Sequence, residues 1–308
     1  MPRTPPHHYA SKVRKPAGFD SFWDGVLEQA AAIPLSAKTT VDRLRSPADV
    51  ETFEVHYDSL DGVRIAGWYC LPRERSKKLP AMLTVPGYLG EPPIPLDWAR
   101  KGYAVFSIAP RGKLRSNEQF NPGYPGLLTH NITDRNTYGY KGFYVDAMRG
   151  VDYLFTRDEV DVGRIGVVGS SQGGGLAIVA AAMRPEIAAA SAGAPYLCGF
   201  IDAIGLTTTY PYQEINDYLR LHPDSRKEVE ETLAYFDGMS FADRITCPIV
   251  VNIGLQDNIC PPETGYEVFN KIASEDKRLY TYDRHAHDAG SHEHSQIIDA
   301  FFSRHLNP

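Results

Sequence analysis

Apolar residues gather in short runs that alternate with amphipathic segments along most of the chain. Four near-continuous apolar runs, bounded by turn-forming residues, are typical of strands covered on both faces. They lie at 81–86, 103–110, 164–169 and 248–254, and a more polar run follows at 278–283. Apolar residues at helical spacing mark segments between and after them, at 136–157, 175–183, 264–273 and 293–306. Strands that alternate with helices predict an α/β fold with a mostly parallel central sheet flanked by helices.

Three further segments complete the predicted architecture. Apolar residues at helical spacing from Phe19 to Ile33 predict an N-terminal helix outside the main fold. Residues 52–72 alternate between apolar and polar positions around Asp61-Gly62, which predicts a β-hairpin at an antiparallel edge. The interval 195–247 lacks a strand pattern and is rich in tyrosine and helix formers, so it predicts a helical insertion before the last strands.

Length and composition fit one large domain. The 308 residues are 43% hydrophobic and 23% charged, as in a globular protein that buries a sizeable core. We therefore expect a single domain over residues 1–308. Residues 1–50 would form an N-terminal helical extension of it, and residues 195–247 the helical insertion.

Charge and segment composition limit the expected partners. The formal net charge of -6 argues against nucleic acid and anionic membranes as main partners. The N-terminal segment lacks the apolar core of a signal peptide, and no stretch approaches the roughly 18 apolar residues that span a bilayer. We therefore expect a cytoplasmic protein. The cysteines lie far apart without C-x-x-C spacing, which predicts four free thiols: Cys70, Cys198, Cys247 and Cys260.

The apolar run at 164–169 leads into Gly169-Ser170-Ser171-Gln172-Gly173 and then into a helical pattern. G-x-S-x-G between a strand and a helix is typical of a nucleophile elbow, a strained turn that lifts the central hydroxyl above the sheet. Gly169 and Gly173 are needed because a Cβ atom there would collide with neighbouring backbone. Ser171 is the candidate nucleophile, and Ser170 lies off the centre of the motif. The N–H of Gln172, at the helix N-terminus, is a candidate oxyanion donor.

An elbow serine requires an acid and then a histidine later in the chain. Asp257 follows the strand predicted at 248–254, at the edge where open α/β sheets place their sites. Asp243 is an alternative acid, but it precedes that strand. Asp257 is therefore the candidate acid.

Four histidines follow the last predicted strand: His285, His287, His292 and His294. The last two are expected to begin the final helix. His287 is the preferred base because Asp288 and a turn follow it, and His285 is the alternative. Four histidines within ten positions also raise the question of a metal site, but no second ligand cluster supports one.

A second oxyanion donor is expected in the loop after the strand at 81–86. The glycine-flanked turn at 86–90 lies there, and the N–H of Tyr88 is the candidate. Nucleophile, base, acid and two donors together predict acyl transfer through a serine-bound intermediate, which needs no metal and no organic cofactor.

The order of these motifs resembles the acetyl xylan esterase/cephalosporin-C deacetylase family, carbohydrate esterase family seven, within the α/β-hydrolase fold. The resemblance spans nearly the whole chain. It is carried by "KPAGFDSFW", "PGYLGEP", "APRGK", "YGYKGFYVDAMRGVDYLFTRDEVDVGRIGVVGSSQGGG", "PYLCGFIDAI", "YFDGMSFADRI" and "GLQDNICPP". It implies deacetylation of small acetylated sugars and related acetyl esters. It also implies that Ser171, Asp257 and a histidine form the triad, with the amides of Tyr88 and Gln172 as the oxyanion hole.

The resemblance further implies a homo-oligomer, a hexamer whose active sites face an inner cavity and admit small substrates. The chain departs from the family's Arg-Gly-Gln motif, which reads Arg111-Gly112-Lys113. We expect Arg111 and Gly112 to keep a structural role, whereas the substrate preference stays open. The family's His-Glu pair is also altered, since His287-Asp288 is the nearer chemical match while alignment from "YTY" favours His285.

Two rival interpretations keep parts of this picture. The same triad would serve a general short-chain carboxylesterase or a peptidase, and the same scaffold without catalysis would serve binding or assembly. The tyrosines in or beside the insertion fill the core and subunit contacts or, alternatively, line a sugar pocket: Tyr196, Tyr210, Tyr212 and Tyr218.

Overall fold

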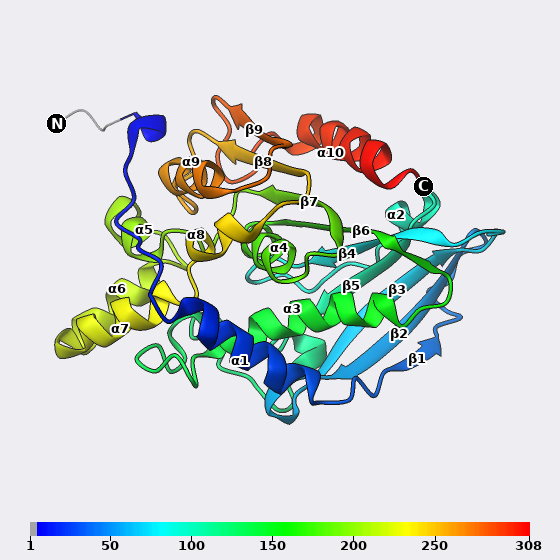
Figure 1. The fold of residues 1–308 in the computed structure, drawn as a ribbon, viewed down its shortest axis with the longest axis horizontal. Coiled ribbons are helices and arrows are strands. Elements are labelled where there is room, and N and C mark those ends of the chain that lie inside the picture. Colours follow the sequence, from blue (N-terminus) through cyan, green and yellow to red (C-terminus); the bar gives the residue numbers. More distant parts are fainter. Residues whose placement is uncertain (1–4) are drawn as a thin grey trace.

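A nine-stranded sheet forms the centre of the molecule in the computed structural model, which describes residues 5–308 (Figure 1). The strands lie side by side in the order β1-β2-β3-β5-β4-β6-β7-β8-β9. Their bounds are β1 (Lys38–Val41), β2 (Val50–Asp58), β3 (Arg64–Pro72), β4 (Leu79–Val85), β5 (Ala104–Ala109), β6 (Val160–Ser170), β7 (Ile187–Gly193), β8 (Ile249–Gly254) and β9 (Lys277–Tyr282).

Strand direction divides the sheet into two parts. β1, β2 and β3 form an antiparallel edge, and β3 pairs antiparallel with β5. Every neighbouring pair from β5 to β9 is parallel. The turn between β2 and β3 contains Asp61 and Gly62, whose φ angles are 63° and 71°. The predicted mostly parallel sheet with an antiparallel edge hairpin is confirmed.

Helices cover both faces of the sheet (Figure 1). Their bounds are α1 (Phe19–Ala31), α2 (Leu96–Arg100), α3 (Gly139–Phe155), α4 (Gln172–Met183), α5 (Phe200–Leu206), α6 (Gln213–Leu221), α7 (Arg226–Ala234), α8 (Gly238–Phe241), α9 (Pro262–Lys271) and α10 (Ser291–Leu306). The larger cluster of buried side chains joins the sheet to α1, α3, α4 and α9. A smaller cluster joins the opposite face to α2 and α10.

The N-terminal helix belongs to the main core, which corrects the expectation that it lies outside the fold. Phe19 and Trp23 are fully buried. The Trp23 ring stacks on Tyr144 of α3, and its Nε1–H donates to the carbonyl oxygen of Tyr235 at 2.8 Å. The sequence pattern showed the amphipathic face of this helix, but it did not show which surface the face would cover.

Three elements were not among those predicted: β1, β7 and α2. β7 lies in the middle of the parallel part, between β6 and β8. Its sequence, "IAAASAG", consists mostly of alanine, which has a low strand propensity. The strand therefore gave no recognisable pattern after the alanine-rich helix α4.

The segment predicted as a helical insertion contains α5, α6, α7 and α8. All four lie near the carboxyl ends of the parallel strands, on the same side of the molecule as α9 (Figure 1). Within the described residues, no helix has both the length and the apolar content that crossing a bilayer requires.

Parallel strands bring four candidate loops to one edge of the sheet. The loop with Tyr88 follows β4, the turn with Ser171 follows β6, Asp257 follows β8, and His287 follows β9. Because the carboxyl ends of parallel strands meet at the same edge, residues far apart in the chain become neighbours there.

Candidate active site

Ser171 occupies the single residue between the end of β6 and the start of α4. Its φ and ψ angles are 59° and -122°, a region that costs a non-glycine residue about 1–3 kcal/mol. Backbone hydrogen bonds hold the turn: the Ser171 N–H donates to the Gly193 carbonyl at 2.9 Å, and the Ser171 carbonyl accepts from the Tyr196 N–H at 3.0 Å. The strained conformation predicted for an elbow is therefore present at this serine.

Close backbone packing explains the glycines on either side. A Cβ atom on Gly169 would lie 2.5 Å from the carbonyl carbon of Gly173, and one on Gly173 would lie 2.3 Å from the oxygen of Val85. Contacts below 3.0 Å require the backbone to move. Any larger side chain at these two positions would displace the turn that carries Ser171.

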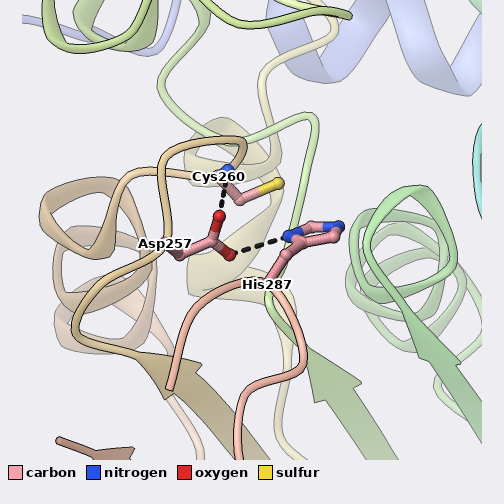
Figure 2. Close-up of side chains that lie close together, drawn as sticks. All are labelled: Asp257, Cys260 and His287. Atoms are coloured by element: carbon pink, nitrogen blue, oxygen red, sulfur yellow. Dashed lines mark hydrogen bonds and ion pairs between the residues drawn. The ribbon is translucent and has the colours of Figure 1, made fainter. Parts of the chain in front are cut away.

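Asp257 and His287 form a hydrogen-bonded pair at the same edge of the sheet (Figure 2). His287 Nδ1 lies 2.7 Å from Asp257 Oδ2. The other carboxylate oxygen accepts from the backbone N–H groups of Ile259 and Cys260 at 2.8 and 2.9 Å. The Asp257 side chain is 1% exposed and the His287 side chain 27%. A proton held on Nδ1 by the carboxylate leaves the lone pair on Nε2, as a general base requires.

The two alternatives from the sequence lie elsewhere. His285 Nδ1 contacts Asp288 Oδ2 at 2.6 Å, so this histidine pairs with a surface carboxylate rather than with Asp257. Asp243 lies on the surface and forms an ion pair with Lys15 at 2.9 Å. Of the histidines considered, the structure brings His287 to the acid that follows β8.

A cavity of about 980 Å³ connects the serine and the histidine. Ser171, Ser170 and His287 all line its wall. No direct hydrogen bond joins Ser171 to His287 within residues 5–308. Such bonds often shorten only when a substrate is bound, so the arrangement suits transfer of the Ser171 proton during attack.

Two backbone N–H groups, those of Tyr88 and Gln172, face no hydrogen-bond acceptor in the described chain. Gln172 is the first residue of α4, where the N–H groups have no intrahelical partner and the helix dipole is positive. Its side chain is buried: Oε1 accepts from Tyr140 at 2.8 Å, and Nε2 donates to the Gly87 carbonyl at 3.3 Å. The main chain of Gln172 is thus fixed beside the loop that carries Tyr88.

Lys113 anchors the same loop through two backbone carbonyls. Its ammonium group donates to the Gly87 carbonyl at 2.7 Å and also to the Tyr88 carbonyl. The Gly87 carbonyl and the Tyr88 N–H belong to one planar peptide group, so a cation on the oxygen fixes and polarises the N–H. Burial lowers the pKa of Lys113 to about 8, although Glu91 opposes this shift. In the sequence Lys113 stands out only as a departure from the family's Arg-Gly-Gln motif, and no local pattern indicates this contact.

The side chain of Tyr88 ties the loop to the insertion. Its hydroxyl hydrogen-bonds to Glu214 of α6, and Glu214 Oε2 accepts from the Gly126 N–H at 2.8 Å. Burial raises the pKa of the Tyr88 hydroxyl and of the Glu214 carboxyl above their ordinary values. The loop is therefore anchored through its side chain as well as its carbonyls.

Arg111 forms a buried ion pair with Asp146 of α3. Both its Nε and its backbone N–H lie 2.9 Å from Asp146 Oδ2. A Cβ atom on Gly142 would lie 1.9 Å from the guanidinium, so the helix needs glycine at that position. Gly112 has a φ of 80°, which glycine adopts without strain. These two residues join β5 to α3 and do not line the cavity.

Cys260 lies close to Asp257 and His287 of the candidate triad (Figure 2). Burial raises the pKa of its thiol well above the ordinary value, although the neighbouring Ser171 hydroxyl opposes this shift. One ligand atom each from Asp257, Cys260 and His287 lies within 4.8 Å of the others, a set that could hold a metal ion. An ion there would displace the hydrogen bond between Asp257 and His287. The four cysteines are free thiols, as predicted.

Most tyrosines of the insertion fill the core. Tyr196 and Tyr212 are fully buried and pack edge to face with ring centroids 4.6 Å apart. Tyr210 is half exposed. None of these three lines the cavity beside Ser171.

Comparisons with known proteins give one consistent result. The profile of the acetyl xylan esterase family matches residues 1–305. The acetyl esterase Axe7A of Xylanibacter ruminicola is 32% identical over 286 residues, which are 87% of this chain. The chain spans 63% of the length of that curated relative.

Two solved structures are similar over nearly their whole length. An acetyl xylan esterase from Paenibacillus sp. R4 is 33% identical, with a TM-score of 0.91 over 99% of this chain and 100% of that chain. Acetyl xylan esterase 1 from Thermoanaerobacterium sp. JW/SL YS485 is 25% identical, with a TM-score of 0.90 over 99% of this chain and 98% of that chain. The predicted α/β-hydrolase fold and the predicted resemblance are both confirmed.

Proposed function

The chain belongs to the acetyl xylan esterase family, and from this premise we propose that it is a serine esterase that removes acetyl groups from small acetylated sugars. The observation that carries the proposal is the convergence of the Ser171 elbow and the Asp257–His287 pair on one cavity. Acetylated xylo-oligosaccharides are the expected substrates, and cephalosporin C-like acetyl esters are further candidates.

The proposed reaction is acyl transfer in two steps. His287 Nε2 accepts the Ser171 proton while the serine oxygen attacks the acetyl carbonyl, and Asp257 stabilises the imidazolium that forms. The oxyanion of the tetrahedral intermediate lies against the N–H groups of Tyr88 and Gln172. The sugar alcohol leaves with the proton from His287. Water then attacks the acetyl-serine, and acetate is released.

The contacts of the oxyanion loop support this assignment. The Gly87 carbonyl receives hydrogen bonds from both Lys113 and Gln172, so the peptide group that carries the Tyr88 N–H is held from two sides. Donors fixed before the reaction stabilise developing charge without reorganisation, and removal of one such donor typically lowers kcat by about 10²–10³-fold.

A panel of substrates tests the proposal against its rivals. Acetylated xylo-oligosaccharides, p-nitrophenyl acetate, longer acyl esters and peptide amides would be compared by kcat/KM. We expect a preference for acetyl esters of sugars. A preference for long acyl chains would instead indicate a general carboxylesterase, and a preference for amides a peptidase.

A serine-directed phosphonate tests the chemistry separately. We expect it to label Ser171 and to abolish acetate release, with the modified residue identified by mass spectrometry. Ser171→Ala is the matched control and should stay unlabelled. A folded protein that neither reacts with the phosphonate nor releases acetate would be a non-catalytic scaffold.

We also propose a homo-oligomer, a hexamer as the resemblance implies. Large apolar side chains are exposed on two loops next to the cavity, with Leu89 at 75% and Leu114 at 73%. Contacts between subunits would cover such side chains and narrow the entrance to the cavity.

A further inference from the structure

One face of the sheet changes from apolar to polar as it approaches Ser171. Residues directly opposite one another in a sheet point to the same face, and so do residues two apart along a strand. Met82 of β4 and Val105 of β5 are such partners, and both belong to the apolar cluster under α2 and α10. Two residues further along these strands, the partners are Thr84 and Ser107.

The polar character continues across the neighbouring strands. Gly193 of β7 lies opposite both Ser170 of β6 and Asn252 of β8. A Cβ atom on Gly193 would lie 3.1 Å from Ser170 Oγ and 3.1 Å from Asn252 Oδ1, so both oxygens border the same small space. A sheet face beneath helices is ordinarily apolar, because buried polar groups without partners are costly.

Four polar atoms on this side of the sheet have no hydrogen-bond partner within the described chain. One of them, Ser191 Oγ, does not line the cavity beside Ser171, and the other three do. These three are Ser107 Oγ, Asn252 Oδ1 and His294 Nε2, and their residues are 1%, 6% and 2% exposed. All three residues line the cavity that also contains Ser171 and His287. Buried donors and acceptors that converge on one cavity with a candidate nucleophile indicate groups that bind a ligand.

The buried polar groups of this cavity are neutral, and its charged lining residues are partly or fully exposed: Glu91, Asp97, Lys101, Asp288 and Asp299. Ser107 and Asn252 carry no charge, and burial lowers the pKa of His294 to about 4, which leaves the imidazole uncharged near neutral pH. Lys101, an exposed residue of the lining, pairs with Asp299 at 2.6 Å. Trp98 of α2 adds an aromatic ring to the wall. Neutral hydrogen-bonding groups next to an aromatic ring suit a sugar ring, which offers hydroxyls and an apolar face, better than they suit an anion.

We infer that this cavity, between the sheet and helices α2 and α10, binds the sugar part of the substrate, whose hydroxyls bond to Ser107, Asn252 and His294. The inference rests on the proposed function for the identity of the acetylated ligand. Beyond the proposed function, the inference specifies on which side of Ser171 the leaving alcohol lies. It also specifies the residues that select this alcohol. A leaving group without hydroxyls would leave all three polar atoms unpaired.

Ser107→Ala tests this site, and Ser191→Ala is a matched control. Both serines are buried on strands of the sheet and both have an unpartnered hydroxyl, but only Ser107 lines the cavity. The quantity measured is kcat/KM for an acetylated xylo-oligosaccharide divided by kcat/KM for p-nitrophenyl acetate. We expect this ratio to fall by about 3–10-fold in Ser107→Ala, as for one lost hydrogen bond, and to stay within about twofold in Ser191→Ala. Equal ratios in the two variants would overturn the inference.

A binding measurement separates this inference from the proposed chemistry. Calorimetric titration of Ser171→Ala with the acetylated xylo-oligosaccharide needs no turnover. We expect binding that weakens by about 3–10-fold when Ser107→Ala is added, and not when Ser191→Ala is added. Binding without turnover by the parent chain would contradict the proposed function alone. Binding that is indifferent to Ser107, or the absence of binding, would contradict the sugar site. Asn252 is left intact because its Nδ2 also donates to the Ala289 carbonyl at 2.7 Å, near His287.

Discussion

Two histidines, two positions apart, show what a single residue contributes at this site. In the sequence both follow the same strand, and each has an acidic residue nearby, so spacing alone could not choose between them. The structure pairs His287 with the carboxylate after β8 and His285 with Asp288. That distinction depends on how a loop folds back across the sheet edge, which no local pattern encodes.

We expect His287→Ala to lower kcat by a factor on the order of 10⁶, because the serine then has no base. His285→Ala should retain activity within a few-fold of the parent chain. Acetate release measures both effects, and circular dichroism checks that each variant is folded. Loss of activity in the His285 variant alone would reassign the base.

The ammonium of Lys113 is expected to set the alkaline side of the pH profile. Its pKa is lowered to about 8, so the charge is present below that pH and is lost as pH rises through it. The polarising cation then leaves the Gly87 carbonyl, and kcat should fall as pH rises past about 8. Steady-state kinetics from pH 6 to pH 10 would record this change.

Substitutions separate charge from anchoring at this position. Lys113→Met removes both and should lower kcat by about 10–100-fold, less than direct removal of an oxyanion donor. Lys113→Gln keeps a donor for one carbonyl, so its kcat should fall less, and its profile should lose the decline near pH 8. A decline that persists in Lys113→Gln would show that another group titrates there.

At the scale of whole elements, strong local patterns predicted structure well and weak ones did not. The buried strands of β-branched and aromatic residues and the amphipathic helices α3, α9 and α10 lie where the sequence placed them. β7 was not predicted because its alanine and glycine residues suit close packing against α4 rather than a strand pattern. Gly174 of α4 packs so closely on this strand that a Cβ atom would lie 2.4 Å from the Gly193 oxygen. Small residues let the helix and the strand approach each other closely. The strand therefore lacks the β-branched and aromatic residues by which a buried strand is recognised.

The ion pair between Arg111 and Asp146 is a buried charged link between the end of β5 and α3. Arg111→Ala would leave a fully buried carboxylate without its cation, and we expect the free energy of unfolding to fall by about 3–5 kcal/mol. Denaturant titration measures the change. Arg115→Ala is a suitable control, because Arg115 pairs with a partly exposed glutamate and should matter far less. Similar losses for the two variants would argue against a structural role of the buried pair.

For the whole molecule, the alternation of strands and helices was enough to predict the sheet and the edge at which the loops meet. The packing of α1 into the core and the cluster of Ser107, Asn252 and His294 at the cavity beneath α10 were not predictable. Both depend on contacts between segments more than a hundred residues apart, such as Trp23 with Tyr235. The loops of the site could be named from motifs, whereas the side of the sheet on which a cavity opens could not.

Assembly is a property of the whole molecule that light scattering can test. We expect the purified chain to have the mass of a hexamer at micromolar concentration. If subunits enclose the active sites, acetylated xylo-oligosaccharides should be hydrolysed faster per acetyl group than polymeric acetylated xylan. Leu114→Asp should weaken assembly through its exposed loop. A monomeric chain, or equal rates on polymer and oligomer, would contradict the proposed hexamer.

The unpartnered hydroxyl of Ser107 in the cavity wall has a consequence for evolution. Ser107→Val would replace an unpartnered hydroxyl with two methyl groups at the wall of the cavity, so the midpoint of thermal unfolding should increase by about 2–4 °C. Without selection for turnover, apolar substitutions at this position would therefore accumulate and raise the thermal stability of the protein. A serine at this position is therefore expected to persist only where selection acts on binding of the sugar.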